Sequence, residues 1–168
     1  LGIDYYFPIR VKARETAYDK DVFHPEFYYE PWEMPGRKYN ADRGWEIYEE
    51  AVVDIGMRIK EDYGNIPWFI SENGIGIEGE DRYRNKEGYI DDDYRIDFLK
   101  GHLQRALKVR NMGSNCFGYF VWSFVDNLSA INAFKNRYGL LELDLKTGNR
   151  IPKKSLYWFK EIMKDREV

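Results

Sequence analysis

A short apolar stretch of the chain ends in residues that could perform nucleophilic or acid–base chemistry. Residues 67–76 read Pro-Trp-Phe-Ile-Ser-Glu-Asn-Gly-Ile-Gly. A short apolar run bounded by proline and glycine predicts a buried parallel strand, and parallel strands that alternate with helices present functional residues at their carboxyl ends. Glu72 stands at that end and is a candidate catalytic carboxylate. The alternative is a carboxylate that caps a turn or pairs with a surface arginine.

Two other apolar runs have the same form. Residues 1–7, Leu-Gly-Ile-Asp-Tyr-Tyr-Phe, begin so abruptly that we expect an element cut short. Residues 116–124 open into a polar loop that starts at Asp126. Strand spacing could bring Asp126 near Glu72, but the favoured interpretation is an aspartate that caps the loop by accepting local hydrogen bonds. The single cysteine, Cys116, predicts a buried thiol in a reducing compartment.

Apolar residues at helical spacing predict helices between these strands. The first covers residues 45–63, the second covers residues 92–110, and the last begins at Pro152, a residue suited to a first helical turn. Their apolar stripes are Ile47, Ala51, Val52, Ile55 and Ile59; Ile96, Leu99, Leu103 and Leu107; and Leu156, Phe159, Ile162 and Met163. A hairpin is predicted over residues 138–151. Strands that alternate with helices indicate an α/β protein with a parallel sheet.

Two polar segments complete the pattern. Residues 8–43 are rich in proline, tyrosine and charge, which predicts a long loop, and loops of this length tend to form the wall or lid of a functional site. Residues 78–91 are densely charged and predict a solvated rim.

The composition excludes several classes of protein. With 168 residues, 43% of them hydrophobic, the chain can bury the core of one domain. A net charge of -3 gives no support for binding to nucleic acid or to an anionic membrane. No apolar stretch approaches the roughly 20 residues that span a bilayer. Aromatic residues make up 17% of the chain and suit sugar rings, although most are expected to fill a core.

The chain resembles glycoside hydrolase family 1, the retaining β-glycosidases, along its whole length. Residues 70–74, Ile-Ser-Glu-Asn-Gly, are similar to the nucleophile motif of the family. The other segments that match occur in the family's order: Gly2–Tyr6, Gly44–Tyr48, Asp92–Ile96, Gly118–Asn127, Arg137–Gly139 and Pro152–Ser155. The resemblance implies a TIM (β/α)8 barrel, of which residues 1–168 form the carboxy-terminal portion with strands six to eight. These last three βα units belong to a single catalytic domain whose amino-terminal units are absent from this chain.

The resemblance implies that Glu72 is the nucleophile and that Tyr6 hydrogen-bonds to it, which would orient the carboxylate and favour its ionised form. A retaining glycosidase also needs a second carboxyl group, roughly 5 Å away, as acid and base. The family carries this group in an Asn-Glu-Pro motif, which does not occur in residues 1–168. We therefore expect the isolated chain to be inactive. Asp4 stands where the family has an asparagine, so that residue's role is not carried over.

The resemblance also implies a substrate. Trp122 matches the tryptophan that lies beneath the sugar. Ser129 and Ala130 stand where enzymes for plain glucosides carry Glu-Trp. A serine there resembles the 6-phospho-β-glycosidases, and alanine in place of the tryptophan looks more like the phospho-glucosidases than the phospho-galactosidases. Those enzymes hold the 6-phosphate with a serine, a lysine and a tyrosine, for which Ser129, Lys135 and Tyr138 are the candidates. A serine in place of the glutamate removes a negative charge and adds a hydrogen-bond donor, which suits the dianionic 6-phosphate.

The lysine position departs from the family pattern, because Asn136 stands where lysine is usual and Lys135 is displaced by one residue. Arg137 is the alternative source of positive charge. We predict a cytoplasmic retaining hydrolase of 6-phospho-β-glucosides such as cellobiose 6-phosphate, without metal or organic cofactor. Its expected partners are the small-molecule substrate and either the missing amino-terminal half of the barrel or a second copy. The alternatives are a β-glucosidase for unphosphorylated glucosides and a non-catalytic sugar-binding fragment.

Overall fold

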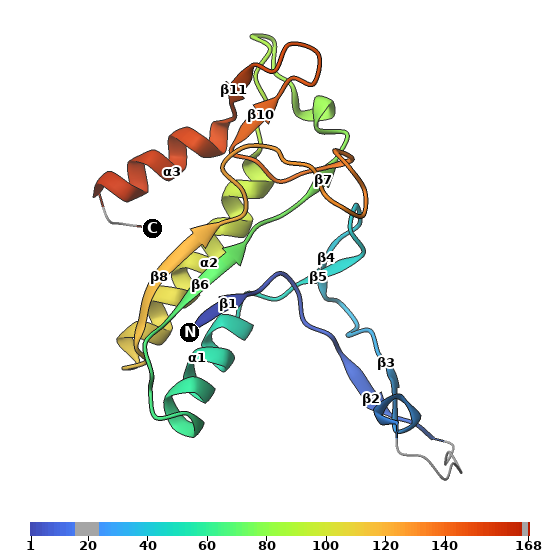
Figure 1. Cartoon of the computed structure of the whole chain (residues 1–168), viewed down its shortest axis with the longest axis vertical. Helices are drawn as coiled ribbons and strands as arrows, with labels where there is room; N and C mark the ends of the chain where they lie inside the picture. The colour runs from blue at the N-terminus through green and yellow to red at the C-terminus, as the bar shows by residue number, and fades with distance from the viewer. Residues whose placement is uncertain (16–23, 166–167) are drawn as a thin grey trace.

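Three parallel strands form the central sheet of the protein, whose structure is a computed structural model that describes residues 1–15, 24–165 and 168. Strands β1 (Gly2–Asp4), β6 (Trp68–Asn73) and β8 (Cys116–Val121) lie in the order β1–β6–β8. Both strand pairs are parallel, so their carboxyl ends meet at one edge of the sheet (Figure 1). The three predicted strands and their parallel arrangement are confirmed.

Helices α1 (Ala51–Asp62) and α2 (Asp93–Asn111) pack on one face of this sheet. Trp68 and Ile70 of β6 and Cys116 of β8 face these helices, and irregularities in the register of the β6–β8 pair interrupt the strict alternation of side chains. The core between sheet and helices contains Val52, Val53, Ile59, Trp68, Ile70, Ala106, Val109 and Cys116. The thiol of Cys116 is buried and free, as predicted. On the other face the ring of Phe69 contacts Phe117 and Phe120, which are 60% and 59% exposed.

The helix predicted over residues 45–63 is wrong in its first part. Trp45–Ile47 form strand β5, which pairs antiparallel with β4 (Lys38–Asn40), and α1 begins only at Ala51. Ile47 falls in phase with the apolar stripe of the helix, so periodicity alone extended the helix too far. The extended conformation of this segment buries Glu46 in an ion pair with Arg10, 2.6 Å between Nη2 and Oε1.

The loop predicted over residues 8–43 also contains regular structure. Strand β2 (Val11–Ala13) pairs antiparallel with β3 (Tyr29–Pro31), and a short 3-10 helix, η1 (Pro25–Phe27), precedes β3. Residues 16–23 of the predicted loop lie outside the described part of the chain. The side chains of β2 are exposed, so no apolar alternation indicates this strand in the sequence.

The carboxy-terminal hairpin is confirmed as strands β10 (Leu141–Leu143) and β11 (Arg150–Pro152). Helix α3 (Lys154–Asp165) follows. Pro152 ends β11 and does not lie in the first helical turn, which corrects the prediction. None of the helices within the described residues is long and apolar enough to cross a membrane.

The segment after β6 is only partly the solvated rim that was predicted. Strand β7 (Ile77–Glu78) pairs with β9 (Asn136–Arg137), and the 3-10 helix η2 (Glu80–Tyr83) follows. Glu80 is buried, because two cations from distant parts of the chain, Arg95 and Lys153, contact its carboxylate. A local charge pattern carries no information about such distant partners.

Candidate active site

Glu72 and Tyr6 meet at the carboxyl ends of neighbouring parallel strands. Glu72 is the penultimate residue of β6, and Tyr6 follows β1 by two residues. The Tyr6 hydroxyl donates a hydrogen bond of 2.8 Å to Oε2 of Glu72. Burial, and then the hydrogen bond to Glu72, raise the pKa of Tyr6 well above its ordinary value. Tyr6 is therefore protonated at neutral pH and serves as a donor to the carboxylate.

Asn73 locks the three strand ends together directly beside Glu72. Its side chain is fully buried; Nδ2 donates to the carbonyl oxygen of Tyr5 at 2.6 Å, and Oδ1 accepts from the hydroxyl of Tyr119 on β8. The backbone completes the link, because the Tyr5 amide donates to the Glu72 carbonyl at 2.9 Å. A carboxylate held on such a rigid frame is already oriented for reaction.

Gly74 and Gly76 allow Trp122 and Tyr138 to approach the segment that follows Glu72. A Cβ atom at Gly74 would lie 1.8 Å from the carbonyl oxygen of Trp122, and one at Gly76 would lie 2.3 Å from the ring of Tyr138. Trp122 immediately follows β8, and the Trp122–Ser123 peptide bond is cis. Any side chain at positions 74 or 76 would push these aromatic residues away, which explains the spacing of the motif.

A cavity of about 350 Å³ opens over Glu72. Five of the residues predicted for the site line it: Tyr6, Glu72, Trp122, Ser129 and Tyr138. Its remaining lining residues are Arg43, Trp45, Asn127, Leu128, Ala130 and Ile131. Aromatic walls and one carboxylate suit a sugar ring, whose C–H faces pack on aromatic surfaces while its hydroxyls need polar partners.

The sixth predicted residue, Lys135, does not line this cavity. Its Nζ atom lies 3.2 Å from Oε2 of Glu78, and the lysine side chain is 60% exposed. The alternative cation, Arg137, contacts Asp126 at 3.8 Å from Nη1 to Oδ2 and is likewise absent from the lining of the cavity. Neither of the cations named from the sequence therefore lines the cavity that contains Ser129 and Tyr138.

Asp126 caps the loop, as the favoured interpretation predicted. It is 2% exposed and accepts hydrogen bonds from the backbone amides of Gly139 (2.8 Å) and Leu143 (3.3 Å). Asp4 also lies outside the lining of the cavity. Its Oδ1 atom accepts a hydrogen bond of 2.7 Å from Ser71 Oγ. Glu72 is the one carboxylate among the described residues that line the cavity.

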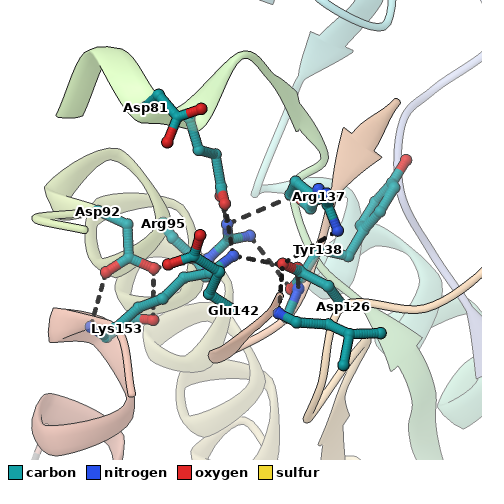
Figure 2. A network of polar contacts seen from close by, with 12 residues as sticks. Asp81, Asp92, Arg95, Asp126, Arg137, Tyr138, Glu142 and Lys153 are labelled. Carbon is teal, nitrogen blue, oxygen red and sulfur yellow. Dashed lines mark hydrogen bonds and ion pairs between the residues drawn. The ribbon is translucent and has the colours of Figure 1, made fainter. Parts of the chain in front are cut away.

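A buried network of charges holds the backbone of Tyr138 in place (Figure 2). Arg95 on α2 donates to the carbonyl oxygens of Ile75 (2.6 Å) and Tyr138 (3.1 Å), and it pairs with Asp92 at 2.8 Å. Lys153 contacts Glu80 at 2.6 Å and Asp126 at 3.0 Å. The side chains of Arg95 and Lys153 are 1% and 0% exposed, so this network is a rigid support behind the cavity.

Sequence reasoning missed Arg43 and Trp45 as residues of this site. They lie in the β4–β5 hairpin and its connection, where the guanidinium carbon of Arg43 stacks 4.1 Å from the centre of the Trp45 ring. Trp45 had been assigned to a helix, and Arg43 to the end of a loop. The prediction that loop 8–43 forms the wall of a site was the signal that could have led to Arg43.

Known proteins that resemble this chain share one family. The sequence profile described as glycosyl hydrolase family 1 matches residues 1–168. A 6-phospho-beta-glucosidase, GmuD, of Bacillus subtilis is 54% identical over 164 residues, which cover 96% of this chain and 35% of that protein. A 6-phospho-beta-galactosidase of Clostridium acetobutylicum is 43% identical over 129 residues, 76% of this chain and 26% of that protein.

A solved structure gives the same result for the fold. The beta-glucosidase from Thermotoga maritima in complex with castanospermine superposes with a TM-score of 0.83 at 31% identity, covering 99% of this chain and 34% of that one. The chain belongs to glycosyl hydrolase family 1. It spans about a third of the length of the Bacillus and Thermotoga proteins, and its fold is the corresponding α/β portion of a family member.

Proposed function

We propose that this chain forms the carboxy-terminal portion, strands six to eight, of a single (β/α)8 catalytic domain that hydrolyses 6-phospho-β-glucosides with retention of configuration. The observation that carries the proposal is the cavity whose lining contains Glu72, hydrogen-bonded by Tyr6, together with Ser129 and Tyr138. The names of the relatives from Bacillus and Clostridium support a phosphorylated substrate.

In the proposed mechanism, Glu72 attacks the anomeric carbon and forms a glycosyl-enzyme intermediate, which water then hydrolyses. Tyr6 orients the carboxylate of Glu72 toward the anomeric carbon through its hydrogen bond. Trp122 supports the sugar ring. A second carboxyl group, roughly 5 Å from Glu72, protonates the leaving oxygen and then activates water. Because the described lining of the cavity holds one carboxylate, we assign this group to the part of the domain that the chain does not span.

The surface of the chain supports a larger domain. Phe117 and Phe120 are exposed on the face of the sheet opposite the helices, and strands β1 and β8 are the outer strands of the central sheet. Exposed aromatic faces and unpaired strand edges promote association. We propose that the isolated chain does not turn over substrate and self-associates. Turnover by the purified 168-residue chain that is lost in Glu72→Ala would contradict the first statement, and a monodisperse monomer in light scattering would contradict the second.

The experiment that tests the substrate uses an enzyme of the relatives' length that contains this chain. We expect kcat/KM for an aryl 6-phospho-β-glucoside to exceed that for the aryl β-glucoside by at least about a hundredfold, because each charge-assisted bond contributes roughly 1.5–3 kcal/mol. Preference for the plain glucoside would favour an ordinary β-glucosidase, as the Thermotoga similarity permits. Binding without any turnover would favour a sugar-binding protein. The proposal includes a cytoplasmic location, which the free thiol of Cys116 fits.

A further inference from the structure

Arg43 is the one cationic side chain among the described residues that line the cavity. We propose that Arg43 binds the 6-phosphate and determines the preference for phosphorylated sugars, in the role for which the sequence suggested Lys135 or Arg137. This inference rests on the proposed function. The phosphate would lie between the β4–β5 side of the cavity, which carries Arg43, and the loop side, which carries Ser129 and Tyr138.

The positive charges of the other candidates are already used. Lys135 pairs with Glu78, and Arg137 contacts the buried carboxylate of Asp126, whose other oxygen accepts from Lys153. Arg43, by contrast, makes no ion pair with a carboxylate in the described part of the chain, where its partners are an amide and two aromatic residues. A guanidinium without a carboxylate partner keeps its charge available for an anion.

The guanidinium of Arg43 is nevertheless held in a defined position. Its plane is supported by the Trp45 ring at 4.1 Å, and Nη1 donates to Oδ1 of Asn136 at 3.3 Å. Asn136 is 4% exposed and stands where lysine is usual in the resembling enzymes, so the buried amide here orients an arginine from another segment. A planar guanidinium fixed in this way can bind phosphate through two parallel hydrogen bonds.

Arg43 is not fully satisfied by the groups around it, because its Nε atom is buried and has no hydrogen-bond partner. Nη1 of Arg137 is in the same state, so the place of Arg43 in the lining of the cavity is what distinguishes the two arginines. Arg43 further interacts with the hydroxyl of Tyr138, where it opposes the rise in the pKa of Tyr138 that burial causes. Arg43 and Tyr138 are thus adjacent donors on one cavity, and Ser129 is the third.

The test compares arginine, lysine and glutamine at position 43 in an enzyme of the relatives' length that contains this chain. For Arg43→Gln we expect kcat/KM on an aryl 6-phospho-β-glucoside to fall roughly 10- to 100-fold, and kcat/KM on the aryl β-glucoside to fall by a much smaller factor, so that the ratio of the two values drops. Arg43→Lys keeps the charge without the planar fork and should lose less than Arg43→Gln. Inhibition by glucose 6-phosphate should weaken in parallel with the loss of kcat/KM.

Three controls make the result specific. Arg58→Gln removes an exposed arginine of α1 and should leave kcat/KM on both substrates unchanged. Lys135→Gln tests the competing assignment: if it removes the preference and Arg43→Gln does not, the inference is wrong. If the unaltered enzyme shows no preference for the phosphorylated substrate, the proposed function itself fails. If Arg43→Gln loses activity on both substrates and has a lower melting temperature, Arg43 has a structural role and the inference is overturned. If Arg43→Gln does not fold, Arg43→Lys, which keeps the charge, decides the case.

Discussion

The hydroxyl of Tyr6 lies 2.8 Å from Oε2 of Glu72, across the neighbouring strands β1 and β6. The two residues are 66 positions apart in the sequence, so this contact depends on parallel pairing in the observed register. The same register places the amide of Tyr5 on the carbonyl of Glu72. Orientation of the carboxylate is therefore a property of the sheet as well as of the tyrosine.

Tyr6→Phe should reduce kcat/KM roughly 10- to 100-fold in an enzyme that contains this chain, because it removes one hydrogen bond to a charged group. The ring of Phe fills the same space, so the melting temperature should change little. Steady-state kinetics on an aryl 6-phospho-β-glucoside measures the effect. An unchanged kcat/KM would mean that Asn73 and the backbone orient Glu72 without the phenol.

Glu72→Ala should remove covalent catalysis and lower kcat by several orders of magnitude, while substrate binding remains, because a nucleophile acts mainly in the transition state. Azide should then restore turnover and give the glycosyl azide of inverted configuration, since a small anion can occupy the space of the carboxylate. The configuration of the product by NMR is the measurement. Inversion by the unaltered enzyme, or no rescue by azide, would show that Glu72 is not the nucleophile.

The parts of the site that could be predicted are those encoded by contiguous segments. Glu72 stands at the end of an apolar run, and the family resemblance of two further runs indicates Tyr6 and Trp122. Parallel pairing brings the ends of such runs together whatever their distance in sequence. Arg43 could not be found in this way. Its place depends on a β4–β5 hairpin that carries no clear alternation and on Asn136, a residue 93 positions away.

The buried charges were also beyond the reach of the sequence. The sequence pattern places Glu80 in a solvated rim, because local charge density does not reveal that Arg95 of α2 and Lys153, which precedes α3, converge on it. Lys135 shows the opposite error. It is adjacent to the expected position, but Asn136 is the buried residue, and Lys135 lies on the exposed side with Glu78. A shift of one residue along the sequence therefore decides which of the two side chains is buried and which is exposed.

Lys153→Met should destabilise the fold by roughly 3–5 kcal/mol, because it removes the buried cation that Glu80 and Asp126 share and leaves their buried charge compensated only by Arg95 and Arg137. The neighbouring residue provides a matched control. Lys154 is half exposed and pairs with Asp93 on the surface, so Lys154→Met should cost less than about 1 kcal/mol. Urea unfolding of both variants measures the difference. Equal destabilisation would mean that the network is not a special support of the site.

His102 should make stability depend on pH. It is fully buried, its Nδ1 lies 2.8 Å from the carbonyl oxygen of Phe98, and burial lowers its pKa from 6.5 to about 4. As the pH falls below about 6.5 the unfolded chain binds a proton that the folded protein does not, so stability declines until the pH reaches about 4. Between pH 7 and pH 5 this amounts to roughly 2 kcal/mol.

The measurement for His102 is the free energy of unfolding at pH 7 and pH 5 for the unaltered protein and for His102→Gln. The variant should lose this part of the pH dependence, although its stability at pH 7 will also be lower. His24→Gln is the control, because His24 is exposed and its replacement should leave the slope intact. If the free energy of unfolding of His102→Gln depends on pH as strongly as that of the unaltered protein, another group is responsible for the pH dependence.

Ser129→Glu should abolish activity on the phosphorylated substrate, because it places a carboxylate against the phosphate on the wall of the cavity. A sugar phosphate carries close to two negative charges near neutral pH, and Ser129 contributes a hydroxyl donor that glutamate lacks. Activity on the plain glucoside should be retained or rise, since a carboxylate accepts hydrogen bonds from sugar hydroxyls. Ala130 still does not supply the tryptophan that follows this glutamate in the family's enzymes for plain glucosides. Ser129→Ala is the control, because it removes the donor without adding charge and should cost roughly tenfold. The measurement is kcat/KM on both aryl glucosides, and a Ser129→Glu enzyme that still prefers the phosphorylated sugar would place the phosphate elsewhere in the cavity.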